Sequence, residues 1–276
     1  MTLATTIHST AIIADGAKIH DSVEIAPYAV IGPNVEIKAG TKIGAHAVID
    51  GFTTIGENCR IFAGASIGLE PQDISYKNEP TGVVIGDRVT VREYATIHRG
   101  TGDRFTKVGD DCFLMAYSHI AHDCKVGNGV IMANNATLAG HVQVGDRAVF
   151  GGTVMIHQNA RVGRMCMIGG ITGTRVDLPP FTVCDNRPAV VVGLNLVGMR
   201  RGKIGQEVRT VIKQAYKLLY GSGLNNTQAL QQIEAELPQF DEIKEIVEFY
   251  RSSKRGVAKG SWGSGSEEGE AGADLG

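Results

Sequence analysis

The sequence predicts an all-β fold, a parallel β-helix, followed by a C-terminal α-helical domain. Isoleucine recurs at every sixth position from Ile7 to Ile67, whereas an α-helix repeats about every 3.6 residues and a strand about every two. A period of six is typical of short stacked strands with a corner after each hexapeptide. Two positions before each isoleucine stands a small or β-branched residue, which would fill the narrow core beside it.

Two insertions interrupt this repeat. It pauses after Gly68, resumes in phase at Ile85, shifts phase once over residues 98–107, and then continues to Ile168. We therefore place the β-helix at residues 1–190, with inserted loops near 68–82 and 98–107. Long loops inside a regular solenoid are commonly functional. Because a histidine-rich stretch follows at once, we expect both loops to take part in function.

Residues 191–256 are expected to form a helical domain. Apolar residues follow helical spacing over residues 208–219, and two more helices are expected at 227–237 and 241–250. Such a cap would protect the exposed strand edges of the last coil. Residues 257–276, which are rich in Gly, Ser and Glu, are expected to be a disordered tail.

Composition narrows the possible functions. The 276 residues carry a net charge of −2, so nothing global favours nucleic acid as a partner. The repeat begins by Thr5 and no long apolar run occurs, so we expect a cytoplasmic protein without stable membrane insertion. The cysteines lie in the small core register or one coil beyond it, and we expect buried thiols rather than disulfides. They are Cys59, Cys112, Cys124, Cys166 and Cys184.

Four of the eight histidines cluster in the second half of the repeat, at positions 119, 122, 141 and 157. His119 and His157 adjoin core residues and should face outward. His122 and His141 fall at corners and are separated by one 18-residue coil plus one residue, so they should lie close together. Single surface histidines are ordinary, but four in under forty residues favour a site.

His122 is followed by Asp123, and a carboxylate beside an imidazole orients the ring and raises its basicity. That pair suits a general base, although Asp is also common at corners. Gly140 precedes His141, and its N–H could face an oxyanion, but a turn glycine explains it equally well. The run from His119 through His122 to Cys124 resembles zinc ligands, yet Cys124 should point into the core, so we expect no metal site.

Several long motifs resemble the acyl-ACP:UDP-N-acetylglucosamine O-acyltransferases of lipid A biosynthesis, a hexapeptide-repeat family. The match covers nearly the whole chain up to about residue 255. The motifs are Gln72-Asp73, Thr96-Ile-His-Arg-Gly100, His119-Ile-Ala-His122-Asp-Cys, Ala133-Asn-Asn-Ala-Thr-Leu-Ala-Gly-His141, Ile156-His-Gln158, Asn195-x-x-Gly198-Met-Arg-Arg201 and Ala215-Tyr-Lys-Leu.

The resemblance implies a left-handed β-helix, a homotrimer with active sites between subunits, and no cofactor. The implied reaction moves an (R)-3-hydroxyacyl group from acyl carrier protein to the 3-hydroxyl of UDP-N-acetylglucosamine. His122 would be the general base, supported by Asp123, and the Gly140 N–H would stabilise the oxyanion. Gly170 matches the position that limits acyl length, and would leave room for a long chain. The substrate would be contacted by Asp73, His119, His141, His157, Gln158, Asn195 and Arg201.

The chain departs from the family pattern at Ser75, Val197 and Gly202, where many members have lysine, an acidic residue and a second basic residue. These changes affect the expected nucleotide contacts, and a 3-amino sugar acceptor remains an alternative. An acidic carrier protein could land on a basic area. Its candidate residues are Arg161, Arg164, Arg175, Arg200, Arg201 and Lys203.

Three other functions fit a hexapeptide repeat. A later N-acyltransferase of the same pathway usually has a separate N-terminal domain, whereas this repeat begins within ten residues. A trimeric zinc carbonic anhydrase is kept open by the spacing of His119 and His122. An ice-binding solenoid would need flat threonine arrays, whereas we expect mixed charged residues at the outward positions here.

Overall fold

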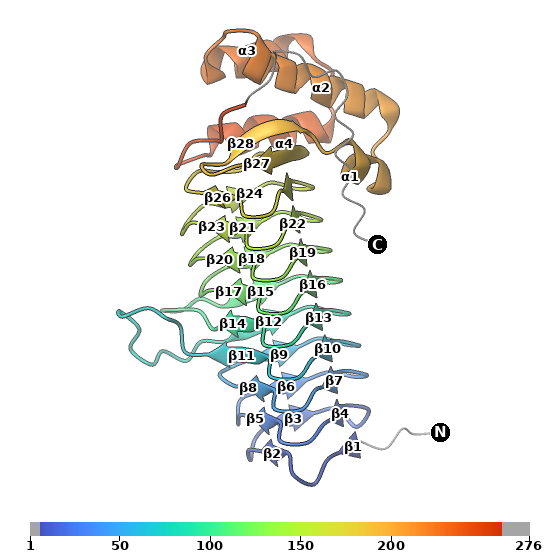
Figure 1. Ribbon diagram of the computed structural model, residues 1–276, viewed down its shortest axis with the longest axis vertical. Helices are drawn as coiled ribbons and strands as arrows, with labels where there is room; N and C mark the ends of the chain where they lie inside the picture. The colour runs from blue at the N-terminus through green and yellow to red at the C-terminus, as the bar shows by residue number, and fades with distance from the viewer. Residues whose placement is uncertain (1–5, 261–276) are drawn as a thin grey trace.

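Three parallel sheets wrap around one hydrophobic core and form a rod, with the helices gathered at one end (Figure 1). The computed structural model describes residues 6–260. Each coil contributes one short strand to each sheet, and we name the sheets A, B and C in chain order. This is the β-helix that the six-residue period predicts.

The strands are two to five residues long. Sheet A contains β1 (Thr6–Ile7), β4 (Glu24–Ile25), β7 (Lys42–Ile43), β10 (Arg60–Ile61), β13 (Thr90–Val91), β16 (Phe113–Leu114), β19 (Ile131–Met132), β22 (Val149–Phe150), β25 (Met167–Ile168), β27 (Thr182–Asp185) and β28 (Val190–Leu194). Sheet B contains β2 (Ile12–Ile13), β5 (Val30–Ile31), β8 (Val48–Ile49), β11 (Ser66–Leu69), β14 (Thr96–His98), β17 (His119–Ile120), β20 (Thr137–Leu138), β23 (Met155–Ile156) and β26 (Gly173–Thr174). Sheet C contains β3 (Lys18–Ile19), β6 (Glu36–Ile37), β9 (Thr54–Ile55), β12 (Val83–Ile85), β15 (Thr106–Val108), β18 (Lys125–Val126), β21 (Gln143–Val144) and β24 (Arg161–Val162).

The strand pairing shows how many residues each insertion adds. Ile37 pairs with Ile55, 18 residues later, whereas Ile55 pairs with Ile85 and Ile85 with Val108. These offsets of 30 and 23 residues mean that one loop adds 12 residues and the other adds 5. The first insertion lies between β11 and β12 and the second between β14 and β15. In Figure 1 the region around β11 and β12 sends loops out from the side of the rod.

The two core registers predicted from the sequence are confirmed. Ile31 and Ala29 are fully buried, as are their equivalents along most of the rod. The first coil is different, since Ile7 remains 42% exposed because no coil lies beneath it. The five cysteines are buried free thiols, as predicted.

Outward positions differ from sheet to sheet, so the expectation of charged outward residues is wrong for sheet B. Sheet C carries charged residues such as Lys18, Lys125 and Arg161. Sheet B carries none. Its outward residues are Ile12, Val30, Val48, Ser66, Thr96, His119, Thr137, Met155 and Gly173.

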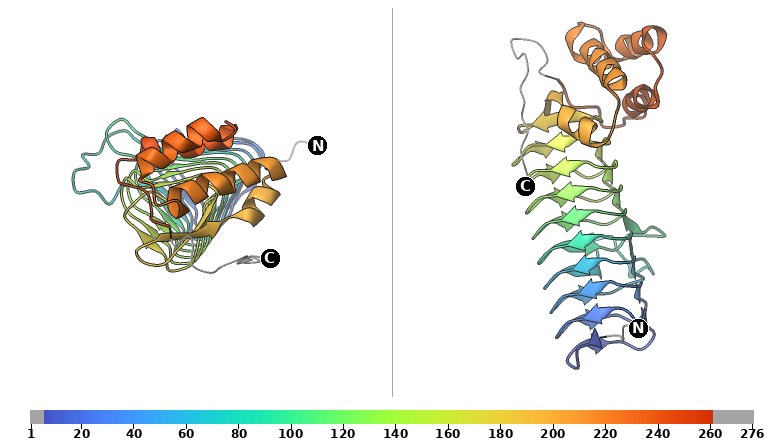
Figure 2. Two further views of the ribbon diagram at one scale, coloured as in Figure 1. Left: turned by 90° about the horizontal axis from the view of Figure 1, so that it is seen from above. Right: turned by 90° about the vertical axis from the view of Figure 1, so that its right-hand side faces the viewer.

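The C-terminal region closes the rod. β28 runs antiparallel to β27, and the four helices α1 (Leu196–Arg201), α2 (Gln206–Gly221), α3 (Asn226–Glu236) and α4 (Asp241–Arg251) follow. Viewed along the rod, the longer helices lie over its end (Figure 2). They share a second core that includes Met199, Ile212, Tyr216, Ile233 and Ile246.

Three of these helices, α2 to α4, were predicted within a few residues of their bounds, whereas the short α1 and strand β28 were not. Tyr216 donates a 2.6 Å hydrogen bond to the Pro180 carbonyl and ties α2 to the rod. In residues 6–260, no helix is long and apolar enough to cross a membrane.

The expected disordered tail begins too early. Val257 and Gly260 form β-bridges with Asp177 and Val191, and Ala258 is only 2% exposed. Their backbone hydrogen bonds to Asp177 and Val191 hold these residues in place. Residues 261–276, the rest of the predicted tail, lie outside the described residues.

Candidate active site

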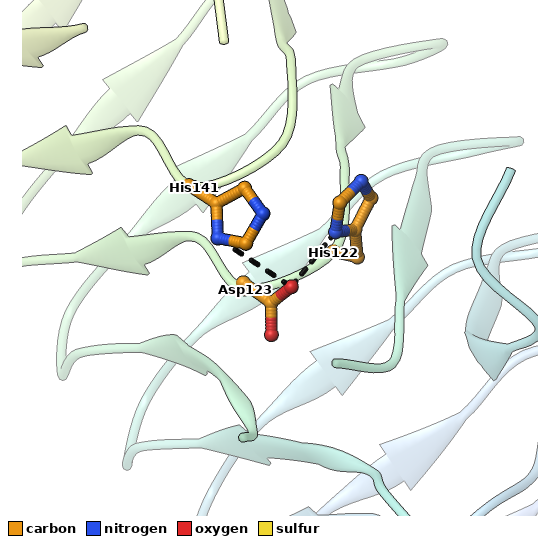
Figure 3. Close-up of side chains that lie close together, drawn as sticks. All are labelled: His122, Asp123 and His141. Carbon is orange, nitrogen blue, oxygen red and sulfur yellow. Dashed lines mark hydrogen bonds and ion pairs between the residues drawn. The ribbon is translucent and has the colours of Figure 1, made fainter. Parts of the chain in front are cut away.

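His122, Asp123 and His141 meet at the edge of the rod between sheets B and C (Figure 3). His122 follows β17, and His141 follows β20 one coil later. The main-chain N–H of His141 donates to the main-chain carbonyl of His122 at 3.0 Å. The two rings meet edge to face with centroids 5.0 Å apart. The closeness predicted from one coil plus one residue is therefore observed.

The corner backbone aims these side chains. Asp123 and His141 have φ of +61° and +62°, in the left-handed region that Asp, Asn and His tolerate better than most residues. Asp123 is thus a turn residue as well as a partner of His122. The two explanations offered by the sequence do not compete.

His122 lies outside the hydrophobic core but is not a solvated surface group. Its side chain is 9% exposed, and that of Asp123 is 1% exposed. Burial by itself would raise the pKa of Asp123. Hydrogen bonds from His122 and from the Thr101 N–H and hydroxyl outweigh burial, so the pKa of this carboxyl lies below its ordinary value.

An ionised Asp123 fixes the tautomer of His122. The carboxylate accepts from Nδ1 at 2.8 Å, so Nδ1 carries the proton and Nε2 is left as an acceptor. Nε2 is 3.9 Å from an oxygen of Asp73. A histidine held in this way can remove a proton from a substrate hydroxyl.

Asp73 brings the first insertion to the same place. One carboxylate oxygen accepts hydrogen bonds from the Ser75 N–H at 2.8 Å and from the Ser75 hydroxyl at 2.7 Å. These bonds lower the pKa of Asp73. Ser75 therefore orients the loop aspartate, at a position where many family members were expected to have lysine.

Gly140 packs directly against the ring of His122. A Cβ atom added to Gly140 would lie 2.5 Å from His122 Nε2, so any side chain would displace the ring. Within residues 6–260, the Gly140 N–H donates no hydrogen bond. It is therefore available to a ligand beside Nε2.

A second histidine pair lies one coil below. His119 Nδ1 is 2.7 Å from the Thr96 hydroxyl, and its ring meets His98 edge to face at 4.8 Å. His98 is 8% exposed and, among the described residues, its Nδ1 has no hydrogen-bond partner. Burial, with smaller contributions from His119 and His122, lowers the pKa of His98 to about 4.

His98 lies within one of the family motifs, but the sequence alone did not indicate a role for it. The signal lay in the 23-residue offset across the second insertion, which sets Thr96 beside His119 and so brings His98 to the same sheet edge. Burial likewise lowers the pKa of His119 and of His141. Burial therefore favours the neutral imidazole at His98, His119 and His141.

His157 and Gln158 lie further along the same edge, beyond His141. The exposed His157 ring is 3.2 Å from the Arg255 guanidinium. Between Asp123 and Arg255 runs a groove of about 610 Å³ with more cations than anions. Its charged lining residues are Arg104, Lys125, Arg161, Lys254 and Arg255, against Asp123 and Asp177.

Asn195 and Arg201 are not brought to the histidines within one chain. Asn195 caps α1 by accepting from the Gly198 N–H and donating to the Met165 carbonyl, next to the corner between sheets C and A. Arg201 is the last residue of α1. Gly170 lies at a third edge, between β25 and β26.

Part of the expected basic landing area is already engaged within the chain. Arg161 binds Asp177 at 2.9 Å and the Phe249 carbonyl at 2.7 Å. Arg164 binds Glu245 at 2.8 Å. Both arginines attach the helices to the rod, so reversing their charge would disturb the fold as well as any partner.

The atoms of His122, Asp123 and His141 that could bind a metal lie within 4.8 Å of one another. Asp123 already accepts hydrogen bonds from His122 and Thr101, so its carboxylate is engaged within the chain. Cys124 is buried and its thiol donates to the Ala139 carbonyl at 3.2 Å. As predicted, it points away from the histidines.

Comparison with known proteins shows the family of the chain. A model for "Bacterial transferase hexapeptide (six repeats)" matches residues 16–51 and 105–140, and one for "Udp N-acetylglucosamine O-acyltransferase; Domain 2" matches residues 177–258. An acyl-[acyl-carrier-protein]–UDP-N-acetylglucosamine O-acyltransferase from Thermodesulfovibrio yellowstonii is 51% identical, over 92% of this chain and 99% of the relative. One from Campylobacter concisus is 44% identical, over 92% and 98%.

A solved structure extends the likeness to three dimensions. The UDP-N-acetylglucosamine acyltransferase from Campylobacter jejuni superposes with a TM-score of 0.87 at 41% identity, over 92% of this chain and 99% of that one. The likeness therefore extends over most of the chain. The chain belongs to the acyl-[acyl-carrier-protein]–UDP-N-acetylglucosamine O-acyltransferase family.

Proposed function

We propose that this protein transfers an (R)-3-hydroxyacyl group from acyl carrier protein to the 3-hydroxyl of UDP-N-acetylglucosamine, the first step of lipid A biosynthesis. One observation carries the proposal. His122 is held by a buried carboxylate through Nδ1 while Nε2 faces Asp73 and the Gly140 backbone. That is the geometry of a general base with an oxyanion donor at its side.

The chemistry follows from these atoms. His122 Nε2 takes the proton of the sugar hydroxyl as its oxygen attacks the thioester carbonyl. The Gly140 N–H donates to the oxyanion of the tetrahedral intermediate. The C–S bond then breaks, and the imidazolium returns its proton to the departing thiolate. Asp123 stabilises the imidazolium between these two proton transfers, and Asp73, 3.9 Å from Nε2, would contact the sugar.

We further propose a homotrimer built on a left-handed β-helix. The outward face of sheet B has no charged residue, and Ile12 is 64% and Val30 36% exposed there. In its upper half sheet A is also apolar, with Phe113, Ile131 and Val149 facing outward. A face of this kind is typical of an interface. Three copies could pair sheet B of one with sheet A of the next and leave the charged sheet C to solvent.

Such an assembly would complete the site. The histidines lie at the edge between sheets B and C, whereas Asn195 and the end of α1 lie near the edge between sheets C and A. When sheet B faces a neighbour's sheet A, these two edges meet. The neighbour's Asn195 and Arg201 would then hold the nucleotide, beside His141, His157 and Gln158 of the first chain.

The same arrangement gives the acyl chain a path. Gly170 precedes β26, three coils beyond β17, at the opposite edge of sheet B from His122. That rise is about 14 Å at ~4.8 Å per coil. An acyl chain starting at the thioester would cross the apolar face of sheet B toward Gly170, where a side chain would shorten the space.

The donor would approach along the cationic groove. Lys125 and Lys254 line it beside Asp123, and an acidic carrier protein with a phosphate-bearing arm is complementary to such charge. Five free, buried thiols fit a reducing compartment, and we place the reaction in the cytoplasm.

Acyl transfer from (R)-3-hydroxyacyl carrier protein to UDP-N-acetylglucosamine tests this function. His122→Ala should lower kcat by ~10²–10⁴ because the base is lost, while the folded rod persists. Lys38→Ala, an exposed change away from the site, should leave kcat unaltered. Full activity without His122 would overturn the mechanism, and stoichiometric zinc with carbon dioxide hydration would favour the anhydrase.

A further inference from the structure

The Asp123 carboxylate has several polar neighbours, and the orientation of its plane decides which of them it binds. Its Oδ2 atom is 2.8 Å from His122 Nδ1, 3.6 Å from His141 Nδ1 and 3.7 Å from the Arg104 guanidinium. Only the first distance is a hydrogen bond. If the carboxylate were free to turn, it could leave His122 and bind His141 or Arg104 instead.

Thr101 removes that freedom. Its N–H donates to Asp123 Oδ1 at 3.0 Å, and its hydroxyl donates to Oδ2 at 2.7 Å. One residue therefore binds both oxygens and sets the plane of the carboxylate. The Asp123 main-chain N–H donates to the Thr106 hydroxyl at 2.9 Å. Asp123 is thus held from both ends of the second insertion.

The insertion is itself fixed in place. The Gly100 carbonyl accepts from the Thr81 hydroxyl at 2.6 Å, and the Gly100 N–H donates to the Gly82 carbonyl at 3.3 Å. A Cβ atom on Gly100 would lie 2.2 Å from the Arg104 carbonyl and 3.0 Å from Asp123 Oδ1. The loop is thus packed closely against the carboxylate at Gly100.

We propose that Thr101 is a positioning residue for the transfer reaction, which fixes the Asp123 carboxylate against His122 and thereby keeps Nε2 of that ring free. The role rests on the proposed function. It gives the five-residue insertion between β14 and β15 a purpose that the repeat itself lacks. Thr101 does not touch the substrate in this account and acts only through Asp123.

Steady-state kinetics on the full chain test the role. Thr101→Val keeps the shape and the main-chain donor but removes the hydroxyl, and should lower kcat about tenfold, as expected for one lost hydrogen bond to a charged acceptor. The KM for the sugar nucleotide should stay nearly constant. Thr101→Ser restores the donor and should restore most of kcat. Thr54→Val, a matched loss of a hydroxyl on the outer face of sheet C, should have no effect.

A double-mutant cycle separates positioning from a general structural role. In an Asp123→Ala background, Thr101→Val should change kcat little, because the carboxylate that Thr101 orients is gone. An equal loss in both backgrounds, or a Thr101→Ser variant no better than Thr101→Val, would overturn the proposal. Thr101→Ala serves the same comparison if the valine variant does not fold. Wild-type protein without any transfer would instead refute the proposed function.

Discussion

Burial of His98 should make the stability of the folded protein depend on pH. Its pKa is lowered to about 4 from an ordinary 6.5, so between these values the unfolded chain binds a proton that the folded chain does not. The contribution of His98 to the free energy of unfolding should therefore be nearly constant well above pH 6.5 and fall as the pH approaches 4. At ~1.4 kcal/mol per pKa unit the loss is at most about 3.5 kcal/mol.

Urea titrations at pH 7.5 and pH 4.5 check this expectation. His98→Gln removes the titrating group and should lose less stability between the two pH values than the wild type. His119 and His141 act in the same direction, since burial also lowers the pKa of each, so the variant should keep part of the slope. Identical losses in both proteins would show that His98 is not the group involved.

For single residues, the sequence predicted that His122 and His141 lie together but did not predict the residues around them. One coil plus one residue was enough to join His122 to His141, because the repeat fixes the register. Thr101 and His98 were not assigned, because their positions depend on the path of the insertions. Loop conformation is set by hydrogen bonds such as the one from Thr81 to Gly100, and no period in the sequence encodes those.

Single coils obey the same register throughout the rod. Ile31 is fully buried and Lys38 is exposed, although both lie in neighbouring hexapeptides. Ile31→Ala should lower the free energy of unfolding by ~2–5 kcal/mol, through lost burial and a cavity that the stacked coils cannot close. Urea midpoints would measure it, with Lys38→Ala as the control. Equal midpoints would mean that the core register is misassigned.

Elements outside the repeat were harder to predict. The amphipathic helices α2 and α4 could be predicted from the spacing of their apolar residues, which form part of the second core. The six-residue α1 is too short for a periodic signal, and it depends on Asn195 as its cap. Strand β28 reverses direction to pair with β27, which ends the parallel stacking and has no counterpart in the repeat.

The arrangement of charge over the whole molecule is consistent with the proposed trimer. Sheet C is charged, sheet B is not, and the histidines lie on the edge between them. A single chain leaves Asn195 and the end of α1, two of the proposed nucleotide contacts, near another edge of the rod. Catalysis by a monomer would therefore lack Asn195 and Arg201, and activity should depend on assembly.

A matched pair of substitutions tests this dependence. Met155 on sheet B and Val84 on sheet C both face outward and are each 37% exposed. Met155→Lys would place three ammonium groups in the trimer interface, at a desolvation cost of several kcal/mol for each ion. Val84→Lys adds the same charge to a face that stays in water. Light scattering should give the mass of three 29.3 kDa chains for the wild type and for Val84→Lys, with a lower mass and reduced transfer for Met155→Lys. If Met155→Lys kept both the assembly and the activity, sheet B would not be the interface, and the nucleotide would have to bind within one chain.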